Sequence, residues 1–137
     1  MKLMEKTKTY IQLKDLDVYK LARKLSDTGW GVYESLNWNE KRIMGNQFIE
    51  SIDSIGANIA EGYARYHYLD KVKFYYISRG SLSEACDHWL ELLCKRNKIE
   101  KNKYDSLKEI AARLSIKLNN FISSVYRSRT TSLNKSR

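Results

Sequence analysis

Residues 107–125, LKEIAARLSIKLNNFISSV, carry the most regular apolar repeat in the chain. Apolar residues recur there at spacings of four, three, four, three and four. They are Leu107, Ala111, Leu114, Leu118, Phe121 and Val125. This alternation predicts a helix that packs lengthwise against a neighbour, because residues three and four apart share one helical face. The chain has no proline and only six glycines, so strong helix breakers are rare throughout.

Three further helices are predicted upstream by the same kind of apolar spacing. The first extends over about residues 15–36. The second begins at Asn37, which resembles a capping box together with Glu40, and ends near Gly62. The third extends from Tyr68 or Leu69 to about Arg96, before a loop over residues 97–102. Their apolar seams are Val18, Ala22, Leu25, Gly29, Val32 and Leu36; Phe48, Ile52, Ile55 and Ile59; and Phe74, Ile77, Ala85, Trp89, Leu92 and Leu93.

Four helices joined by short connections pack as antiparallel neighbours. We therefore predict an all-α fold, an up-down-up-down antiparallel four-helix bundle over residues 15–126. A basic N-terminal segment, residues 1–14, precedes it, and a basic flexible tail, residues 127–137, follows it. At 137 residues the chain is long enough for one such core.

The net charge of +9 indicates a polyanionic partner, and the predicted end segments hold most of it. Residues 1–14 contribute +3 and residues 127–137 contribute +4, which leaves +2 for the rest. The candidate nucleic-acid contacts in these segments are Lys2, Lys6, Lys8, Lys14, Arg127, Arg129, Lys135 and Arg137.

The sequence has neither a signal peptide nor an apolar run long enough to span a bilayer. Its two cysteines, Cys86 and Cys94, lie eight residues apart on one predicted helix, too far apart along the axis to bond to each other. Free thiols are typical of a reducing compartment, so we expect a cytoplasmic protein.

Residues 54–68, SIGANIAEGYARYHY, raise a question of function because small residues surround one Asn and one Glu before a run of aromatics and bases. Small side chains favour a close helix contact within or between subunits. A ligand or nucleic-acid site and, less readily, a catalytic site are the alternatives. If the second and third helices form a hairpin, Arg79 comes near Asp53, and we hypothesise a polar cluster of these two residues with Asn58.

Aromatic and basic side chains are interleaved over residues 63–76. Aromatic rings can stack on unpaired bases while cations neutralise phosphates, so Arg65, Lys71 and Lys73 join the candidate nucleic-acid contacts. The alternative is that the rings fill the core or an interface and the cations are merely solvated.

No spacing in the sequence indicates catalysis, a metal site or a cofactor. The chain has only two histidines, and it lacks the Glu-x-x-His pairs of diiron bundles, the spacings of zinc sites and a phosphate-binding glycine loop. We therefore expect no enzyme activity, no catalytic residues, no metal and no cofactor.

Three segments together resemble a known family: residues 54–68, Ile77 to Glu84 (ISRGSLSE) and Leu16 to Ala22 (LDVYKLA). The chain is similar, over about residues 13–126, to the four-helix bundle proteins encoded in intervening sequences of bacterial large-subunit ribosomal RNA genes. The matching motif positions are Asn58, Glu61, Gly62, Arg79, Gly80, Ser81 and Glu84. The resemblance implies a bundle that forms a ring, typically a pentamer, with no enzymatic activity assigned. The accessory variability determinant of diversity-generating retroelements, similar in fold, is a basic pentamer that binds a reverse transcriptase and nucleic acid.

Apolar residues also exceed what four seams require, which favours homo-oligomers, because monomers rarely expose large apolar patches. The surplus residues are Leu16, Tyr19, Leu21, Trp30, Tyr33, Ile49, Ile110, Ile116 and Ile122. The sequence thus favours an oligomer without enzyme activity that binds RNA, DNA or a nucleic-acid enzyme such as a reverse transcriptase. The alternative is a structural or protein-binding oligomer whose charge serves solubility.

Overall fold

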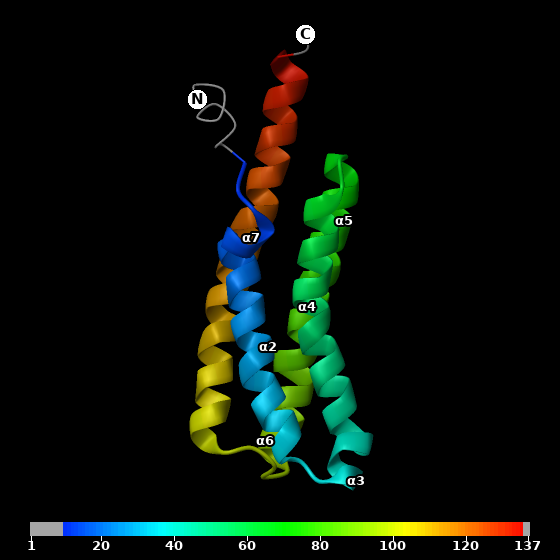
Figure 1. Cartoon of the computed structure of the whole chain (residues 1–137). Coiled ribbons are helices and arrows are strands. Elements are labelled where there is room, and N and C mark those ends of the chain that lie inside the picture. Colours follow the sequence, from blue (N-terminus) through cyan, green and yellow to red (C-terminus); the bar gives the residue numbers. More distant parts are fainter. Residues whose placement is uncertain (1–9, 136–137) are drawn as a thin grey trace, which may run out of the picture.

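The structure is a computed structural model that describes the backbone of residues 10–135 and the side chains of residues 10–129. Lys2, Lys6, Lys8 and Arg137, four of the candidate contacts, lie outside the described residues, and so does the side chain of Lys135. Over residues 10–135 every regular element is helical, and four long helical stretches make up the fold (Figure 1). The predicted all-α class with four helices is therefore confirmed.

Two of the four stretches contain a π-helical turn. The 3-10 turn η1 (Leu13–Asp15) leads into α2 (Asp17–Ser35), the first long helix. The second stretch comprises α3 (Trp38–Glu40), the π-helical η2 (Lys41–Gly45) and α4 (Asn46–Ala64). The third comprises α5 (Tyr68–Ser83), the π-helical η3 (Glu84–Trp89) and α6 (Leu90–Lys95). The fourth is α7 (Lys101–Lys135).

The second stretch starts at the predicted capping box. The Asn37 side chain accepts from the Glu40 backbone N–H, and the Glu40 carboxylate accepts from the Asn37 backbone N–H, both at 2.9 Å. These two bonds satisfy donors that a helix start otherwise leaves unpaired. At the opposite boundary, after α6, Asn97 adopts φ 57°, the left-handed conformation that asparagine tolerates better than most residues.

Three of the four predicted seams are largely confirmed. All six seam residues of α2 and all four of α4 are buried, and α7 buries four of its six, with Phe121 and Val125 partly buried against the core. The seam predicted for the third stretch is wrong in α5, where Ile77 is 41% exposed and Tyr75 and Ser78 are buried instead. The apolar pattern missed this register because Ser78, a polar residue, is buried: its hydroxyl donates to the Ile55 carbonyl of α4 at 2.9 Å.

The structure also differs from the predicted start of the C-terminal tail. Helix α7 does not end at Tyr126 but continues to Lys135, so most of the segment 127–137 is helical. The segment contains neither proline nor glycine, and basic residues in a last helical turn interact favourably with the helix dipole.

The four long helices surround one core in the cyclic order α2, α4, α5, α7, each packing against the next and α7 against α2. In Figure 1 the connections from α2 to α3 and from α6 to α7 lie at the lower end of the molecule, and the α4–α5 turn lies at the upper end. Residues 10–12 and the projecting C-terminal part of α7 also lie at the upper end. Over the described residues, every helix is too short or too polar to cross a lipid bilayer.

Candidate functional site

Polar residues of the 54–68 motif bond to one another within α4, and one of them, Ser54, also bonds to α5. The Asn58 amide donates to the backbone carbonyl and the hydroxyl of Ser54, at 2.8 and 2.9 Å. The Ser54 and Ser81 hydroxyls lie 2.9 Å apart across the two helices. These contacts satisfy the Asn58 amide within the bundle, which favours the packing interpretation of the motif.

The hypothesised cluster of Arg79, Asp53 and Asn58 does not form. Arg79 is exposed on the opposite side of α5, where its guanidinium donates to Asn119 of α7 at 3.2 Å and lies 4.7 Å from the Tyr76 ring centroid. Asp53 lines a groove between α2 and α4 instead. The prediction failed because Ser78, not Arg79, is the α5 residue that faces α4.

Among the remaining motif residues, Gly62 is the one for which the structure most clearly requires its residue type. A methyl group at its Cα would lie 2.7 Å from the Tyr75 ring and 3.0 Å from the Lys71 carbonyl oxygen, so only glycine fits without displacement. Gly80, in contrast, has no atom of another segment within 4 Å of the corresponding position. Glu84 accepts from the Trp89 indole N–H at 2.8 Å, one π-helical turn away.

At the upper end of the bundle, Tyr10 and Ile11 contact Tyr63, near the α4–α5 turn. The Tyr10 and Tyr63 rings lie 5.8 Å apart, and the Tyr63 hydroxyl donates to the Ile11 carbonyl. Burial raises the pKa of Tyr63, so its hydroxyl stays protonated and able to donate. Tyr66, in the turn itself, is 89% exposed. One end of the molecule thus presents aromatic faces to solvent.

The structure places the three predicted cations near this turn in different environments. The Lys71 ammonium donates to the Tyr63 carbonyl at 2.9 Å, near the C-terminus of α4, and burial lowers its pKa. Arg65 pairs with Glu61 at 2.5 Å and lies 4.9 Å from the Phe74 ring centroid. Lys73 is exposed and makes no side-chain hydrogen bond or ion pair with another described residue. Of the three, Lys73 is therefore the most available to a partner.

The basic residues of α7 reach the same end. Arg129 lines a pocket of about 390 Å³ together with His67, Tyr68, Leu69 and Asp70, at the start of α5. Arg127 is exposed, and so is Lys14, which lies in η1. We call the residues Lys14, Arg65, Tyr66, Lys73, Arg127 and Arg129 the basic end.

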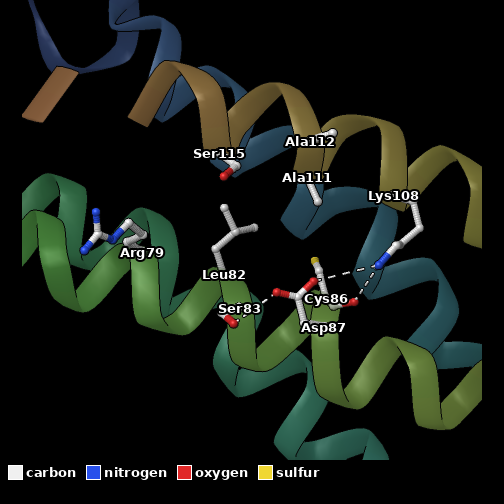
Figure 2. Close-up of a pocket in the computed structure, with 9 residues that line it drawn as sticks. All are labelled: Arg79, Leu82, Ser83, Cys86, Asp87, Lys108, Ala111, Ala112 and Ser115. Carbon is white, nitrogen blue, oxygen red and sulfur yellow. Dashed lines mark hydrogen bonds and ion pairs between the residues drawn. The ribbon is translucent and has the colours of Figure 1, made fainter. Parts of the chain in front are cut away.

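A second pocket, of about 290 Å³, lies between α5 and η3 on one side and α7 on the other (Figure 2). Its α7 wall is formed by small residues, Ala111, Ala112 and Ser115, facing Leu82 and Cys86. Burial raises the pKa of the Cys86 thiol to about 12, so at neutral pH it is a protonated thiol and a poor nucleophile.

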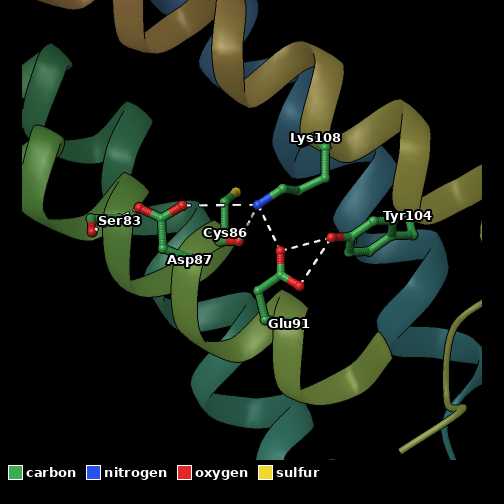
Figure 3. A network of polar contacts seen from close by, with 6 residues as sticks. All are labelled: Ser83, Cys86, Asp87, Glu91, Tyr104 and Lys108. Atoms are coloured by element: carbon green, nitrogen blue, oxygen red, sulfur yellow. Dashed lines mark hydrogen bonds and ion pairs between the residues drawn. The ribbon is translucent and has the colours of Figure 1, made fainter. Parts of the chain in front are cut away.

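Lys108 closes one end of this pocket and organises the polar network of Figure 3. Its ammonium donates to the Cys86 carbonyl at 3.1 Å and pairs with Glu91 at 2.8 Å and, more loosely, with Asp87 at 3.9 Å. The Tyr104 hydroxyl donates to the same Glu91 carboxylate at 2.7 Å. Because Lys108 and Tyr104 both stabilise its anionic form, the pKa of Glu91 is lowered.

This network cross-links α6 and η3 to α7, which otherwise share few contacts. The network was not predicted from the sequence. Asp87 and Glu91 are four residues apart, as are Tyr104 and Lys108, so each pair lies on one helical face. The sequence does not show that these two helical faces pack against each other. Within the described part of the chain, His, Cys, Asp and Glu side chains form no group of three or more that could hold a metal ion.

The chain matches one protein family and is similar to a solved structure. The model of the 23S rRNA-intervening sequence protein family matches residues 14–120. The chain is also similar to a crystal structure from Bacteroides thetaiotaomicron of a protein with unknown function from the S23 ribosomal protein family, at 26% sequence identity and a TM-score of 0.70. That similarity covers 77% of this chain and 97% of the crystallised one. No curated protein matches the sequence.

Proposed function

This chain belongs to the 23S rRNA-intervening sequence protein family, and on that premise we propose that it is a non-enzymatic, cytoplasmic homo-oligomer that binds nucleic acid through its basic end. In this proposal the four helices run up-down-up-down, and a nucleic-acid enzyme such as a reverse transcriptase is a further partner that basic surfaces could bind.

The observation that carries the proposal is the convergence at one end of the bundle. Residues 10–12, the α4–α5 turn and the C-terminal part of α7 are distant in sequence yet lie together at the upper end in Figure 1. Lys73 and Arg127 are exposed there, and Arg129 lies at the start of α5. Lys2, Lys6 and Lys8, which precede Tyr10 in the sequence, carry three more positive charges but lie outside the described residues.

The exposed aromatic rings point to unpaired nucleotides as the ligand of the basic end. Tyr66 is 89% exposed and Tyr10 is 70% exposed, so both rings offer faces on which a base could stack. Base-on-aromatic stacking contributes about 1–3 kcal/mol per base and tolerates any sequence. The cations would hold the phosphates on either side.

The proposed oligomer would place several basic ends on one particle and so strengthen individually weak phosphate contacts. Most of the apolar surplus proves to be internal, since Leu16, Leu21, Ile49, Ile110 and Ile122 are buried. Trp30, at 49% exposure, and Ile116, at 64%, remain for subunit contacts. Light scattering tests the assembly: a pentamer of this 16.1 kDa chain has a mass of about 80 kDa.

Two observations favour the alternative, a structural or protein-binding oligomer without nucleic-acid binding. Two of the basic residues near the turn, Lys71 and Arg65, are already engaged within the subunit. At the lower end, moreover, Trp38 is 73% exposed and Ile43 is 56% exposed, so apolar side chains are available to a protein partner there.

The experiment that separates the two functions is a titration of the full chain with a fluorescent single-stranded RNA, read by anisotropy. We expect Tyr66→Ala and the double variant Lys73→Gln/Arg127→Gln each to weaken binding about tenfold. Arg42→Gln/Lys95→Gln removes two exposed cations elsewhere and is the matched control, with binding close to that of the parent chain. Absence of RNA binding by the parent chain at 50 mM salt would favour the alternative.

A further inference from the structure

The fourth helix carries most of the net positive charge of the protein. Residues 101–135, the span of α7, contain eight Lys and Arg residues against two Asp and Glu residues, a net charge of +6. Residues 15–100, by contrast, contain 12 basic and 13 acidic residues. Three of these eight cations, Arg127, Arg129 and Lys135, belong to the C-terminal segment 127–137. Residues 101–126 of the same helix have a net charge of +3, so α7 also carries positive charge along the side of the bundle.

One ion pair shows which residues of α7 lie at the solvent-exposed boundary with α2. The Lys117 ammonium lies 3.4 Å from the Asp17 carboxylate, so these residues mark the outer seam between the two helices. Lys20 and Lys24 follow Asp17 by three and seven residues and therefore lie on the same strip of α2. Arg113 precedes Lys117 by four residues and lies on the same strip of α7.

Antiparallel packing brings the two strips together. In Figure 1, α2 descends along the left of the molecule while α7 rises beside it, so residues further along α2 lie beside earlier residues of α7. Counted from the Asp17–Lys117 pair, Lys20 is level with the turn of α7 that holds Arg113, and Lys24 lies about one turn further down. Towards the upper end the α7 strip continues through Asn120 and Ser124 to Arg127, about 21 Å from Arg113 along the axis. We call Lys20, Lys24, Arg113, Lys117 and Arg127 the α2–α7 face.

The cations of this face are largely unneutralised. Lys20, Lys24 and Arg113 are exposed, and none of their side chains makes a hydrogen bond or ion pair with another described residue. The nearby acids are Asp15 and Asp17, which line one pocket with Lys117, Asp27, one turn after Lys24, and Glu109, one turn before Arg113. Of these, only Asp17 forms an ion pair with a cation of the face. A line of exposed cations on two rigid helices is a favourable surface for regularly spaced anions.

We propose that the α2–α7 face binds the phosphate backbone of a nucleic-acid double helix. The proposal deepens the nucleic-acid binding proposed above but uses different residues, apart from Arg127. Among the described residues, the large exposed aromatic side chains lie elsewhere: Trp30 lines the α2–α4 groove, and Tyr126 contacts Tyr76 of α5. A surface with cations and no stacking platform suits paired strands, whose bases are not accessible for stacking.

The test compares two triple variants of the full chain. Lys20→Gln/Lys24→Gln/Arg113→Gln removes three cations from the α2–α7 face. Arg42→Gln/Lys95→Gln/Lys103→Gln removes three exposed cations from other surfaces and changes the net charge equally. Each is titrated by anisotropy with a 20-base-pair RNA duplex, a DNA duplex of the same sequence and a single-stranded RNA, at several salt concentrations. Circular dichroism confirms that both variants are folded.

Counterion release sets the expected size of the effect. Each phosphate contact on a duplex contributes a slope of about −0.9 in log K against log salt, or about eightfold in affinity at 0.1 M salt. Loss of three contacts should reduce the magnitude of the slope by about 2.7 and weaken duplex binding by up to about 500-fold. The control triple should keep the slope of the parent chain, and single-strand binding should change little in either variant.

The outcomes separate this inference from the proposed function. Equal losses in the two triple variants would overturn it, because net charge alone would then explain binding. Failure of the parent chain to bind either duplex at 50 mM salt, with single-strand binding retained, would overturn the inference and leave the proposed function standing. Failure of the parent chain to bind any of the three probes would overturn both the inference and the proposed function. Selective loss in the face variant with one duplex alone would identify RNA or DNA as the source of the phosphates.

Discussion

Replacing Gly62 by alanine tests whether α4 and α5 approach as closely at the basic end as the structure requires. The added methyl carbon would lie 2.7 Å from Cε1 of Tyr75, 2.9 Å from Cβ of Phe74 and 3.0 Å from the Lys71 carbonyl oxygen. Two of these three atoms cannot move without moving the α5 backbone. Overpacking of this kind costs about 1–3 kcal/mol of unfolding free energy, and the upper half of that range applies here.

A gain in helix propensity partly offsets this loss. Alanine is favoured over glycine inside a helix by about 1 kcal/mol, so the net destabilisation of Gly62→Ala should be about 1–2 kcal/mol. Gly80→Ala is the matched control, since Gly80 is exposed in α5 and nothing lies within 4 Å of its added carbon. That variant should be more stable than the parent by about 0.5–1 kcal/mol.

Urea denaturation followed by circular dichroism measures both changes. The two variants should differ by about 2–3 kcal/mol, or about 8 °C in Tm, with Gly62→Ala the less stable. If Gly62→Ala matched or exceeded Gly80→Ala in stability, the close approach of α4 and α5 at this end would be wrong.

Three further predictions concern the contacts between helices. Ser78→Ala removes the hydroxyl that donates to the Ile55 carbonyl in the core and should cost about 1 kcal/mol in urea denaturation; an unchanged midpoint would exclude that bond. Arg79→Met should change the unfolding free energy by less than about 0.5 kcal/mol, because the guanidinium is exposed; a large loss would restore the buried cluster. The pKa of Glu91 is lowered by Lys108 in the fold, so its contribution is present above the ordinary value of 4.5 and disappears as the pH falls through the lowered one. Thermal melts should therefore show Glu91→Gln less stable than the parent at pH 7 and losing less stability on acidification; parallel pH profiles would refute the role of the network.

Much of the fold could be predicted because the apolar spacing of three helices is regular. The seams of α2 and α4 match the buried residues throughout, and the Asn37 capping box lies where the residue types indicate. In α5 the prediction failed for a physical reason: burial of Ser78 costs little when its hydroxyl has a carbonyl to bond, and hydropathy alone does not record that partner.

The candidate site could be predicted only in part, because residue type indicates what a side chain can bind but not what it already binds. Arg65, Lys71 and Lys73 look alike in the sequence, yet the first is paired with Glu61, the second caps a helix end and the third is exposed. The α2–α7 face was missed for a related reason. Its cations are scattered through the sequence of two helices, and only antiparallel packing brings them together.

The most direct test of the central claim is the salt dependence of RNA binding by the full chain, measured as log K against log salt between 50 and 300 mM. With five or more phosphate contacts on single-stranded RNA, the account predicts a straight line with a slope of about −3.5 or steeper. An affinity that does not change with salt, or no measurable affinity at 50 mM, would contradict it.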